Sequence, residues 1–554
     1  MNENCTVSQY ILLRLQEIGI KHLFGVPGDY VLDFLDKVVE SPIRWVGTCN
    51  ELNAGYAADG YARMNGAGAA VVTYGVGSMS ILNAVAGAFA EHVPLIVING
   101  APPAKRRESG ALVHHLVSNY YLQLDIFKKV CCDAAILTDP VTAPDEIDRI
   151  LRNCITRKLP AYLELPADMV NAPCRKPGEL LSAVKSTSDE ENLADCISEA
   201  AGIFNKSDHP MILAGVELLR FGLGSEALQL VEASEVPFAT MLGSKSVLPE
   251  LHPQFVGMYQ GGWSRDAVRN QVEGSDCLLS IGVWITDLDT GLFSMNLDNR
   301  RMITAGGGRV RIGNHYYEQI QLGDFIRGLA AAIKPRSYLA SHPAESYKPK
   351  QPFIPNASCE LTAKRLYESL NFNLDDSMIL LAEPGDAFCA APAFHIEEAE
   401  NFIVQSYYCS IGYCTPAALG VSLARPQKRP VVLTGDGAFQ MTAQEISTMI
   451  REHRPVIIVI INNDGYLIER RLHQDAYYND IQMWNYANLP AVFDRGSFSI
   501  GIRATTEEEL DDAIKLAVRE KDRLVLIEAC IPGRDCSKGL ERLGEAFRKA
   551  QQKK

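Results

Sequence analysis

Short runs of apolar residues alternate with amphipathic segments along most of the chain. Each run has the length of a buried strand, and a segment of helical length separates it from the next. The clearest runs are 69–72, 94–98, 210–213, 277–281, 431–433 and 455–461. Because strands separated by helices pair in parallel, the pattern predicts an α/β fold with parallel sheets.

Two proline-containing stretches, 171–192 and 335–355, interrupt this alternation and are typical of interdomain linkers. The chain has 554 residues, which is more than one hydrophobic core usually supports. We therefore expect three doubly wound domains, each with a central parallel sheet. Their expected limits are residues 1–180, 190–340 and 356–554.

Composition and charge narrow the class of protein. The content of 47% hydrophobic and 22% charged residues is typical of a globular protein, and the net charge of −14 argues against a nucleic-acid partner. The 14 cysteines lack Cys-x-x-Cys spacing, which favours a reducing cytoplasm over a disulfide framework. Residues 1–20 predict an amphipathic helix and no signal peptide, and the run 76–90 predicts a buried helix too short for a bilayer, so we expect no membrane partner.

Two polar motifs follow neighbouring apolar runs in the last third of the chain. Gly-Asp-Gly stands at 435–437, and Asn-Asn-Asp-Gly stands at 462–465. In a right-handed strand–helix–strand unit, Asp436 and Asn463 emerge side by side at one edge of the sheet. Together with the carbonyl of Gly465, they would suit octahedral Mg²⁺ completed by phosphate oxygens. Either motif alone is more often an ordinary turn, so their pairing carries the inference.

This pairing resembles the signature by which thiamine enzymes bind thiamine diphosphate (ThDP). The resemblance extends over nearly the whole chain to the pyruvate, indolepyruvate, phenylpyruvate and branched-chain 2-keto acid decarboxylases. Motifs similar to theirs stand in the same order at 24–30, 49–54, 73–77 and 113–115. The resemblance implies a first domain that binds the pyrimidine, a structural middle domain and a third domain that binds the diphosphate. It also implies non-oxidative decarboxylation of a 2-keto acid to an aldehyde and CO₂, with ThDP and Mg²⁺.

The resemblance assigns cofactor roles to individual residues. Glu51 matches the glutamate that shifts the aminopyrimidine toward its imino form, which is a strong enough base to activate the cofactor. Without the other motifs, Glu51 would be a carboxylate that stabilises a helix start. Cys409 stands where the family carries glycine, and it can serve through its carbonyl if its backbone angles are ordinary. The implied cofactor-binding residues are Glu51, Thr73, Cys409, Ile411, Gly435, Asp436, Gly437, Ala438, Asn463 and Gly465, with Asp436, Asn463 and Gly465 as metal ligands.

Proton transfer is implied for Asp29, His114, His115 and Glu469, which match the acid–base group of the decarboxylases. Loss of CO₂ must be followed by protonation and release of the aldehyde, and neighbouring carboxylates and imidazoles tune each other's pKa for such steps. The alternatives are a polar loop for the histidine pair and an exposed helix residue, paired with Arg470 or Arg471, for Glu469.

The implied substrate pocket consists of Pro384, Phe388, Ile468, Leu472, Leu543 and Phe547. Phe388 stands where relatives restricted to pyruvate tend to carry tryptophan, and Pro384 departs from the usual Thr or Gln. The smaller ring favours aromatic or branched aliphatic substrates, although a methylene is worth only about 1–3 kcal/mol of discrimination. The alternative is that these residues, above all Leu543 and Phe547, pack the core.

The family also implies an assembly, because its pyrimidine and diphosphate halves meet across subunits. A homodimer would be the smallest active unit, and a homotetramer is expected. Two other functions remain open: a carboligase of the acetolactate synthase kind, and a catalytically silent ThDP-fold scaffold. The histidine pair and Glu469 argue against the carboligase, and the presence of Glu51 and Glu469 argues against the scaffold.

Overall fold

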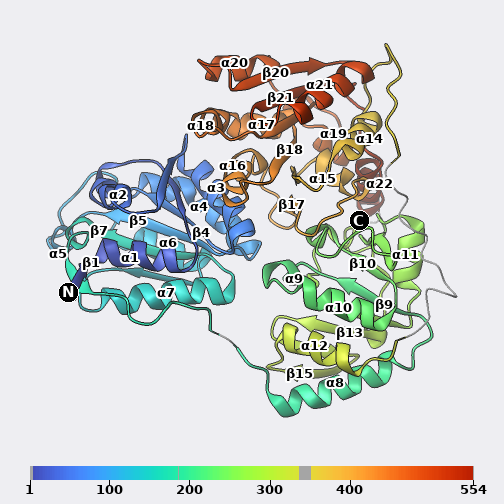
Figure 1. Cartoon of the computed structure of the whole chain (residues 1–554), viewed down its shortest axis with the longest axis horizontal. Coiled ribbons are helices and arrows are strands. Elements are labelled where there is room, and N and C mark those ends of the chain that lie inside the picture. Colours follow the sequence, from blue (N-terminus) through green and yellow to red (C-terminus); the bar gives the residue numbers. More distant parts are fainter. Residues whose placement is uncertain (1–3, 185, 336–350, 553–554) are drawn as a thin grey trace.

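The computed structural model describes residues 4–184, 186–335 and 351–552, which form three α/β domains (Figure 1). Each domain is built on its own sheet with helices on both faces, which confirms the predicted fold class. The second expected linker lies mostly outside the described residues, because 336–350 are not described. No helix in the described ranges is both long and apolar enough to cross a membrane.

The first domain contains a six-stranded parallel sheet in the order β3-β2-β4-β5-β7-β6. Its strands are β2 (His22–Gly25), β3 (Arg44–Gly47), β4 (Gly68–Val72), β5 (Leu95–Ala101), β6 (Asp133–Ile136) and β7 (Ala161–Pro166). Its helices are α1 (Val7–Glu17), α2 (Leu32–Val39), α3 (Glu51–Asn65), α4 (Val76–Ala90), α5 (Ala104–Glu108), α6 (Leu122–Val130) and α7 (Ala143–Arg157).

The two ends of this domain pair with each other. Strand β1 (Asn4–Thr6) pairs antiparallel with β8 (Pro173–Arg175), and Thr6 then caps α1 through its side chain. The expectation of a helix from the first residue was therefore wrong for 4–6, where pairing with β8 satisfies the backbone. The first expected linker likewise begins with a strand.

The middle domain has a seven-stranded mixed sheet in the order β11-β10-β9-β12-β13-β14-β15. Its strands are β9 (Pro210–Ala214), β10 (Phe238–Thr240), β11 (Phe255–Met258), β12 (Cys277–Ile281), β13 (Met302–Gly306), β14 (Arg309–Ile312) and β15 (His315–Glu318). Its helices are α8 (Glu190–Phe204), α9 (Glu217–Arg220), α10 (Gly224–Ser234), α11 (Asp266–Glu273) and α12 (Leu322–Ala332). Strands β14 and β15 are antiparallel because tight turns join them to β13, so this sheet departs from the predicted parallel pairing at one edge.

The third domain repeats the topology of the first, with six parallel strands in the order β17-β16-β18-β19-β21-β20. Its strands are β16 (Met378–Ala382), β17 (Phe402–Val404), β18 (Arg429–Gly435), β19 (Ile457–Asn462), β20 (Ser499–Ala504) and β21 (Leu524–Cys530). Its helices are α14 (Ala363–Asn373), α15 (Asp386–Ala390), α16 (Cys414–Ala424), α17 (Asp436–Thr442), α18 (Ile446–Arg451), α19 (Leu467–Leu472), α20 (Leu489–Phe493), α21 (Glu507–Arg519) and α22 (Lys538–Gln552).

In both parallel sheets the direction in which successive strands are added reverses once. The reversal lies between the neighbouring strands β2 and β4 in the first domain and between β16 and β18 in the third. Such a reversal opens a crevice outside the carboxyl ends of the strands, where ligands of doubly wound sheets bind. The first and third domains therefore each offer one such crevice.

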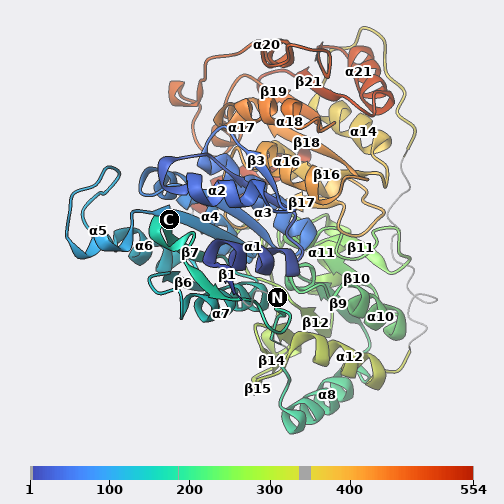
Figure 2. The same ribbon diagram turned by 60° about the vertical axis from the view of Figure 1, so that its left-hand side comes forward.

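Helices α3 and α16 join these two domains and occupy equivalent places in them (Figures 1 and 2). A Cβ atom at Gly420 would lie 1.8 Å from the carbonyl oxygen of Ala57, and one at Gly60 would lie 2.3 Å from that of Ala417. The two backbones thus approach more closely than any larger residue would permit. Their contact lies inside the largest apolar cluster, which spans both domains.

Candidate active site

The crevice of the third domain brings the two predicted polar motifs together. Gly435 at the end of β18 pairs with Ile461 in β19, so the residues that follow both strands are neighbours. Asp436 is 1% exposed, and its Oδ2 accepts the backbone N–H groups of Asn463 at 3.2 Å and Gly465 at 3.0 Å. The loop after β19 is therefore folded around the Asp436 carboxylate.

This crevice holds a cleft of about 50 Å³, and all the residues that line it belong to the third domain. The predicted residues along it are Pro384, Ile411, Gly435, Asp436, Gly437, Ala438, Asn463, Gly465 and Ile468. Burial raises the pKa of Asp436 to about 6, and a cation beside the carboxylate would favour its ionised form. A carboxylate, an amide and a carbonyl oxygen are the donors that Mg²⁺ prefers, so the residues fit a magnesium diphosphate group.

Glu383, which the sequence analysis did not single out, fixes the loop before α16. It follows β16 directly, it is fully buried, and it accepts the backbone N–H groups of Gly412, Tyr413 and Cys414 at 2.9, 3.1 and 3.1 Å. Burial raises its pKa to about 7 against these hydrogen bonds. Its position after an apolar run, at the carboxyl edge of a sheet, is a signal that could have found it.

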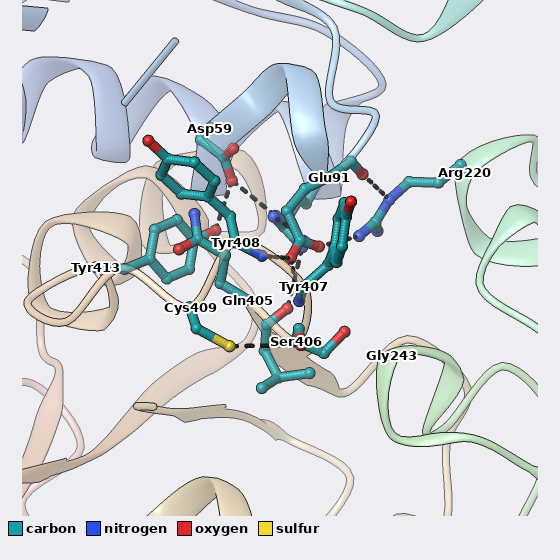
Figure 3. A network of polar contacts seen from close by, with 12 residues as sticks. Asp59, Glu91, Arg220, Gly243, Gln405, Ser406, Tyr407, Tyr408, Cys409 and Tyr413 are labelled. Carbon is teal, nitrogen blue, oxygen red and sulfur yellow. Dashed lines mark hydrogen bonds and ion pairs between the residues drawn. The ribbon is translucent and has the colours of Figure 1, made fainter. Parts of the chain in front are cut away.

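A buried network from three domains holds the segment that carries Cys409 (Figure 3). The Oε1 atom of Glu91 accepts the backbone N–H groups of Tyr407 at 2.7 Å and Tyr408 at 3.1 Å. Its Oε2 atom forms ion pairs with Arg220 of the middle domain at 3.2 Å and with Arg63 at 3.7 Å. Glu91 therefore connects this loop of the third domain to both other domains.

Cys409 has a backbone φ of +53°, in the left-handed region. The condition stated for Cys409, ordinary backbone angles, is therefore not met. Cysteine therefore occupies a position whose backbone conformation favours glycine. The Sγ atom of Cys409 donates a hydrogen bond to the carbonyl oxygen of Ser406 at 3.4 Å. The left-handed conformation costs a non-glycine residue roughly 1–2 kcal/mol.

Cys409→Gly is consequently expected to raise the free energy of unfolding by about 1 kcal/mol, because it removes this steric cost. The thermal midpoint should rise by about 2–4 °C and decarboxylation should persist, since the backbone carbonyl remains. Cys414→Gly, at the helical start of α16, is the matched control and should lower the midpoint. A lower midpoint for Cys409→Gly would show that its thiol contacts outweigh the strain.

The crevice of the first domain gathers three of the four predicted proton-transfer residues. Asp29 Oδ2 lies 2.5 Å from Nε2 of His114, and Asp29 Oδ1 lies 4.0 Å from Nε2 of His115. The ring of Tyr30 stacks on His114 with centroids 4.8 Å apart. The side chains of Asp29 and His114 are 50% and 59% exposed, so the group is open at the surface of the chain.

Glu51 and Thr73 lie beside this group. Glu51 begins α3, and a Cβ atom built on Gly77 would lie 3.3 Å both from Glu51 Oε1 and from the Thr73 side chain. Thr73 is 6% exposed, and its hydroxyl has no hydrogen-bond partner in the structure. A buried hydroxyl without a partner is costly, which fits a polar ligand group at this position. Asp29, Glu51, Thr73 and the histidine pair thus follow β2, β3, β4 and β5, respectively, at one sheet edge.

Glu469 lies on α19 of the third domain with an exposed side chain. Its neighbour Arg470 pairs with Asp475 at 3.3 Å and Asp480 at 2.7 Å. Among the ion pairs of the described residues, none joins Glu469 to Arg470 or Arg471, and none joins it to the Asp29 group of the same chain. The ion pairs of the described residues therefore give no support to the alternative that Glu469 pairs with Arg470 or Arg471.

The predicted substrate-pocket residues divide into two sets. Pro384 and Ile468 line the cleft, whereas Phe388 and Leu543 are 3% and 2% exposed within an apolar cluster. Leu472 and Phe547 pack against that cluster, where α19 and α22 lie side by side. In the single chain, Leu543 therefore packs in the core, which was the alternative considered for it.

Comparisons with known proteins match the two domains that contain the crevices to cofactor-binding domains of one enzyme family. Models of the thiamine pyrophosphate enzymes match the chain as an N-terminal TPP binding domain over 5–124, a central domain over 197–332 and a C-terminal TPP binding domain over 385–529. An alpha-keto-acid decarboxylase of Mycobacterium leprae (strain TN) is 38% identical over 537 residues, covering 96% of this chain and 93% of the relative. One of Mycobacterium avium (strain 104) is 38% identical over 536 residues, covering 95% and 94%.

Two domains that bind thiamine pyrophosphate, with crevices of matching topology, define a thiamine enzyme. Within that class the chain belongs to the alpha-keto-acid decarboxylase family, and it is a ThDP-dependent decarboxylase of 2-keto acids. The resemblance predicted from the motifs is thereby confirmed.

Proposed function

We propose that the enzyme converts aromatic or branched-chain 2-keto acids into aldehydes and CO₂ with ThDP and Mg²⁺ at sites shared between two subunits. The observation that carries this proposal is the separation of two half-sites. The Asp29 group lies in the crevice of the first domain, while the cleft at Asp436 is lined by third-domain residues alone. A second copy of the chain would supply each cleft with its missing half, as in a symmetric dimer.

Asp436, Asn463 and the carbonyl of Gly465 would hold Mg²⁺, and Gly435, Gly437 and Ala438 would lie against the diphosphate. ThDP, when bound, supplies the electron sink for loss of CO₂. Glu51 would hydrogen-bond the pyrimidine, and Ile411, which is 37% exposed at the cleft, would support the bent cofactor. The carbonyl of Cys409 would face the pyrimidine.

Asp29, His114 and His115 from one subunit and Glu469 from the other would transfer the protons that follow CO₂ loss. Asp29 holds the His114 ring by a charge-assisted hydrogen bond and would keep that imidazole oriented. Glu469 would complete the group from the opposite wall. If each site takes residues from two subunits, Asp29 and His114 on one chain and Glu469 on the other would all be exposed in a single chain.

The preferred substrate follows from the apolar residues near the cleft. Pro384 and Ile468 line it. Phe388 follows the lining residue Ala387, and its ring is smaller than the tryptophan that the resemblance associates with restriction to pyruvate. We place the enzyme in the cytoplasm, where the free thiols of the described residues stay reduced, and expect a homotetramer built from dimers. The proposed partners are the 2-keto acid substrate and further copies of the chain, with no nucleic acid and no membrane.

A substrate panel tests the preference. With ThDP and Mg²⁺ present, kcat/KM for phenylpyruvate or 4-methyl-2-oxopentanoate should exceed that for pyruvate by about tenfold or more, because an apolar wall gains about 1–3 kcal/mol per added group. Aldehyde formation through a coupled alcohol dehydrogenase gives the rates. A higher kcat/KM for pyruvate than for both larger acids would overturn the proposed preference.

A further inference from the structure

A buried carboxylate of the first domain, Glu164, holds both ends of the loop that carries the histidine pair. This loop, residues 109–121 between α5 and α6, is called the histidine loop here. Glu164 lies in β7 and is 0% exposed. It accepts a hydrogen bond from Nη2 of Arg107 at 2.5 Å, before the loop, and one from Nε2 of Gln123 at 2.8 Å, after it. One side chain therefore fixes both the beginning and the end of the histidine loop.

The beginning of the histidine loop is held by a buried ion pair. Arg107 lies in α5, and its side chain is 7% exposed, against 0% for that of Glu164. The guanidinium also lies over the rings of Tyr120 and Tyr121, at 5.9 and 5.4 Å from their centroids. Burial raises the pKa of the Glu164 carboxyl group, and the charge of Arg107 acts against that rise. Because removal of either partner would leave an uncompensated buried charge, the pair is costly to break.

Gln123 connects the same carboxylate to the backbone beside His115. Its Nε2 also donates to the hydroxyl of Tyr162 at 2.8 Å, and that hydroxyl donates to Glu164 at 2.9 Å. Its Oε1 accepts the backbone N–H of Gly75 at 3.1 Å. Gly75 has a φ of +63°, and a Cβ atom there would lie 2.1 Å from the carbonyl oxygen of His115. The contacts therefore run from the Glu164 carboxylate through Gln123 to the backbone of His115.

The histidine loop depends on these anchors because its own structure is irregular. Residues 109–121, all of which the structure describes, contain no helix and no strand. The side chains of His114 and His115 are 59% and 31% exposed, so packing alone does not fix them. His115 has a φ of +67°, a conformation that a non-glycine residue keeps only where its surroundings impose it. The places of both imidazoles therefore follow from how the ends of the loop are held.

We propose, on the basis of the proposed function of the histidine pair, that Glu164 is a positioning residue which places His114 and His115 for proton transfer. It does so by holding both ends of the histidine loop. A carboxylate suits this position because both of its oxygens accept hydrogen bonds, one from Arg107 and the other from Gln123. An amide has one accepting and one donating end, so an amide at this position could hold only one end of the loop.

Glu164→Gln in the holoenzyme is expected to lower kcat by about tenfold or more, while hydrogen–deuterium exchange at the reactive carbon of ThDP stays within about twofold of the wild type. The exchange measures cofactor activation, which depends on Glu51 and not on the histidine loop. The double variant Glu164→Gln with Gln123→Glu should recover most of kcat, because the exchanged amide and carboxylate can form the same hydrogen bonds. The matched control is Glu108→Gln, an exposed carboxylate at the end of α5, which should keep the wild-type kcat.

Two further variants distinguish the ways in which the proposal can fail. Gln123→Met keeps the ion pair and removes the second anchor, so it should lower kcat in the same way and decides the question if Glu164→Gln does not fold. His114→Gln should lower kcat without slowing the exchange, and full kcat in this variant would overturn the proposed proton transfer together with the role of Glu164. Full kcat in Glu164→Gln or Gln123→Met beside an impaired His114→Gln would overturn the role of Glu164 alone. An equal loss of kcat and exchange, or no recovery in the double variant, would assign Glu164 to the stability of the fold.

Discussion

A mixture of a Glu51→Gln variant and an Asp436→Asn variant is expected to regain about a quarter of the wild-type activity after their subunits are exchanged, as the symmetry of a shared site requires. Each variant alone should be nearly inactive. Glu51→Gln removes the carboxylate that activates the cofactor, at a cost of roughly 10²–10⁴ in rate, and Asp436→Asn removes a charged metal ligand.

The recovery follows from counting sites. In a mixed dimer, one site receives both altered residues and the other receives the unaltered Glu51 of one subunit and Asp436 of its partner. Half of the dimers are mixed after random exchange, so about a quarter of all sites are intact. If both residues served one site within a single chain, no dimer would contain an intact site and no activity would return.

The control for this experiment pairs Glu51→Gln with Asp29→Asn. Both changes lie in the first domain, so every site of the mixed dimer contains one of them, and activity should stay at the level of the separate variants. Recovery in this control would show that Asp29 and Glu51 serve different sites, which would contradict the proposed division of the site between subunits. Coupled aldehyde formation measures all three mixtures.

Asp29→Asn is expected to lower kcat by roughly 10²–10⁴ while the ThDP dissociation constant stays within about twofold of the wild type. The reason is that Asp29 contacts His114 and His115, whereas the cofactor residues Glu51 and Asp436 are untouched. Tryptophan fluorescence or calorimetry gives the ThDP affinity, and steady-state kinetics gives kcat.

The matched control is Asp33→Asn, an exposed carboxylate one turn away at the start of α2, which should leave kcat unchanged. A loss of ThDP affinity in Asp29→Asn equal to its loss of kcat would assign Asp29 to cofactor binding. An unchanged kcat would remove Asp29 from the proton-transfer group.

The strands of the parallel sheets were predictable because strands buried on both faces are continuous apolar runs. The predicted run 277–281 coincides with β12, and 69–72 differs from β4 by one residue. Strands β14 and β15 have the sequences Arg-Val-Arg-Ile and His-Tyr-Tyr-Glu, whose polar residues hide an edge strand from this criterion. Local pattern therefore found the centres of sheets and missed an edge.

The functional site was likewise predicted only in part from local sequence patterns. Asp436 and Asn463 could be paired from sequence because parallel topology places the ends of adjacent strands together. Glu91 and Tyr407 are 316 positions apart, and no local pattern reports that one holds the other. The left-handed backbone of Cys409 is equally hidden, since a cysteine at that position reveals its φ only after the surrounding loop is built.

The most direct test of the account is the ratio of aldehyde to CO₂ formed from a single 2-keto acid by the holoenzyme. Decarboxylation with release of aldehyde predicts one aldehyde for each CO₂, and loss of both when ThDP or Mg²⁺ is withheld. Release of CO₂ with a coupled hydroxyketone product in place of aldehyde would identify a carboligase and contradict the account.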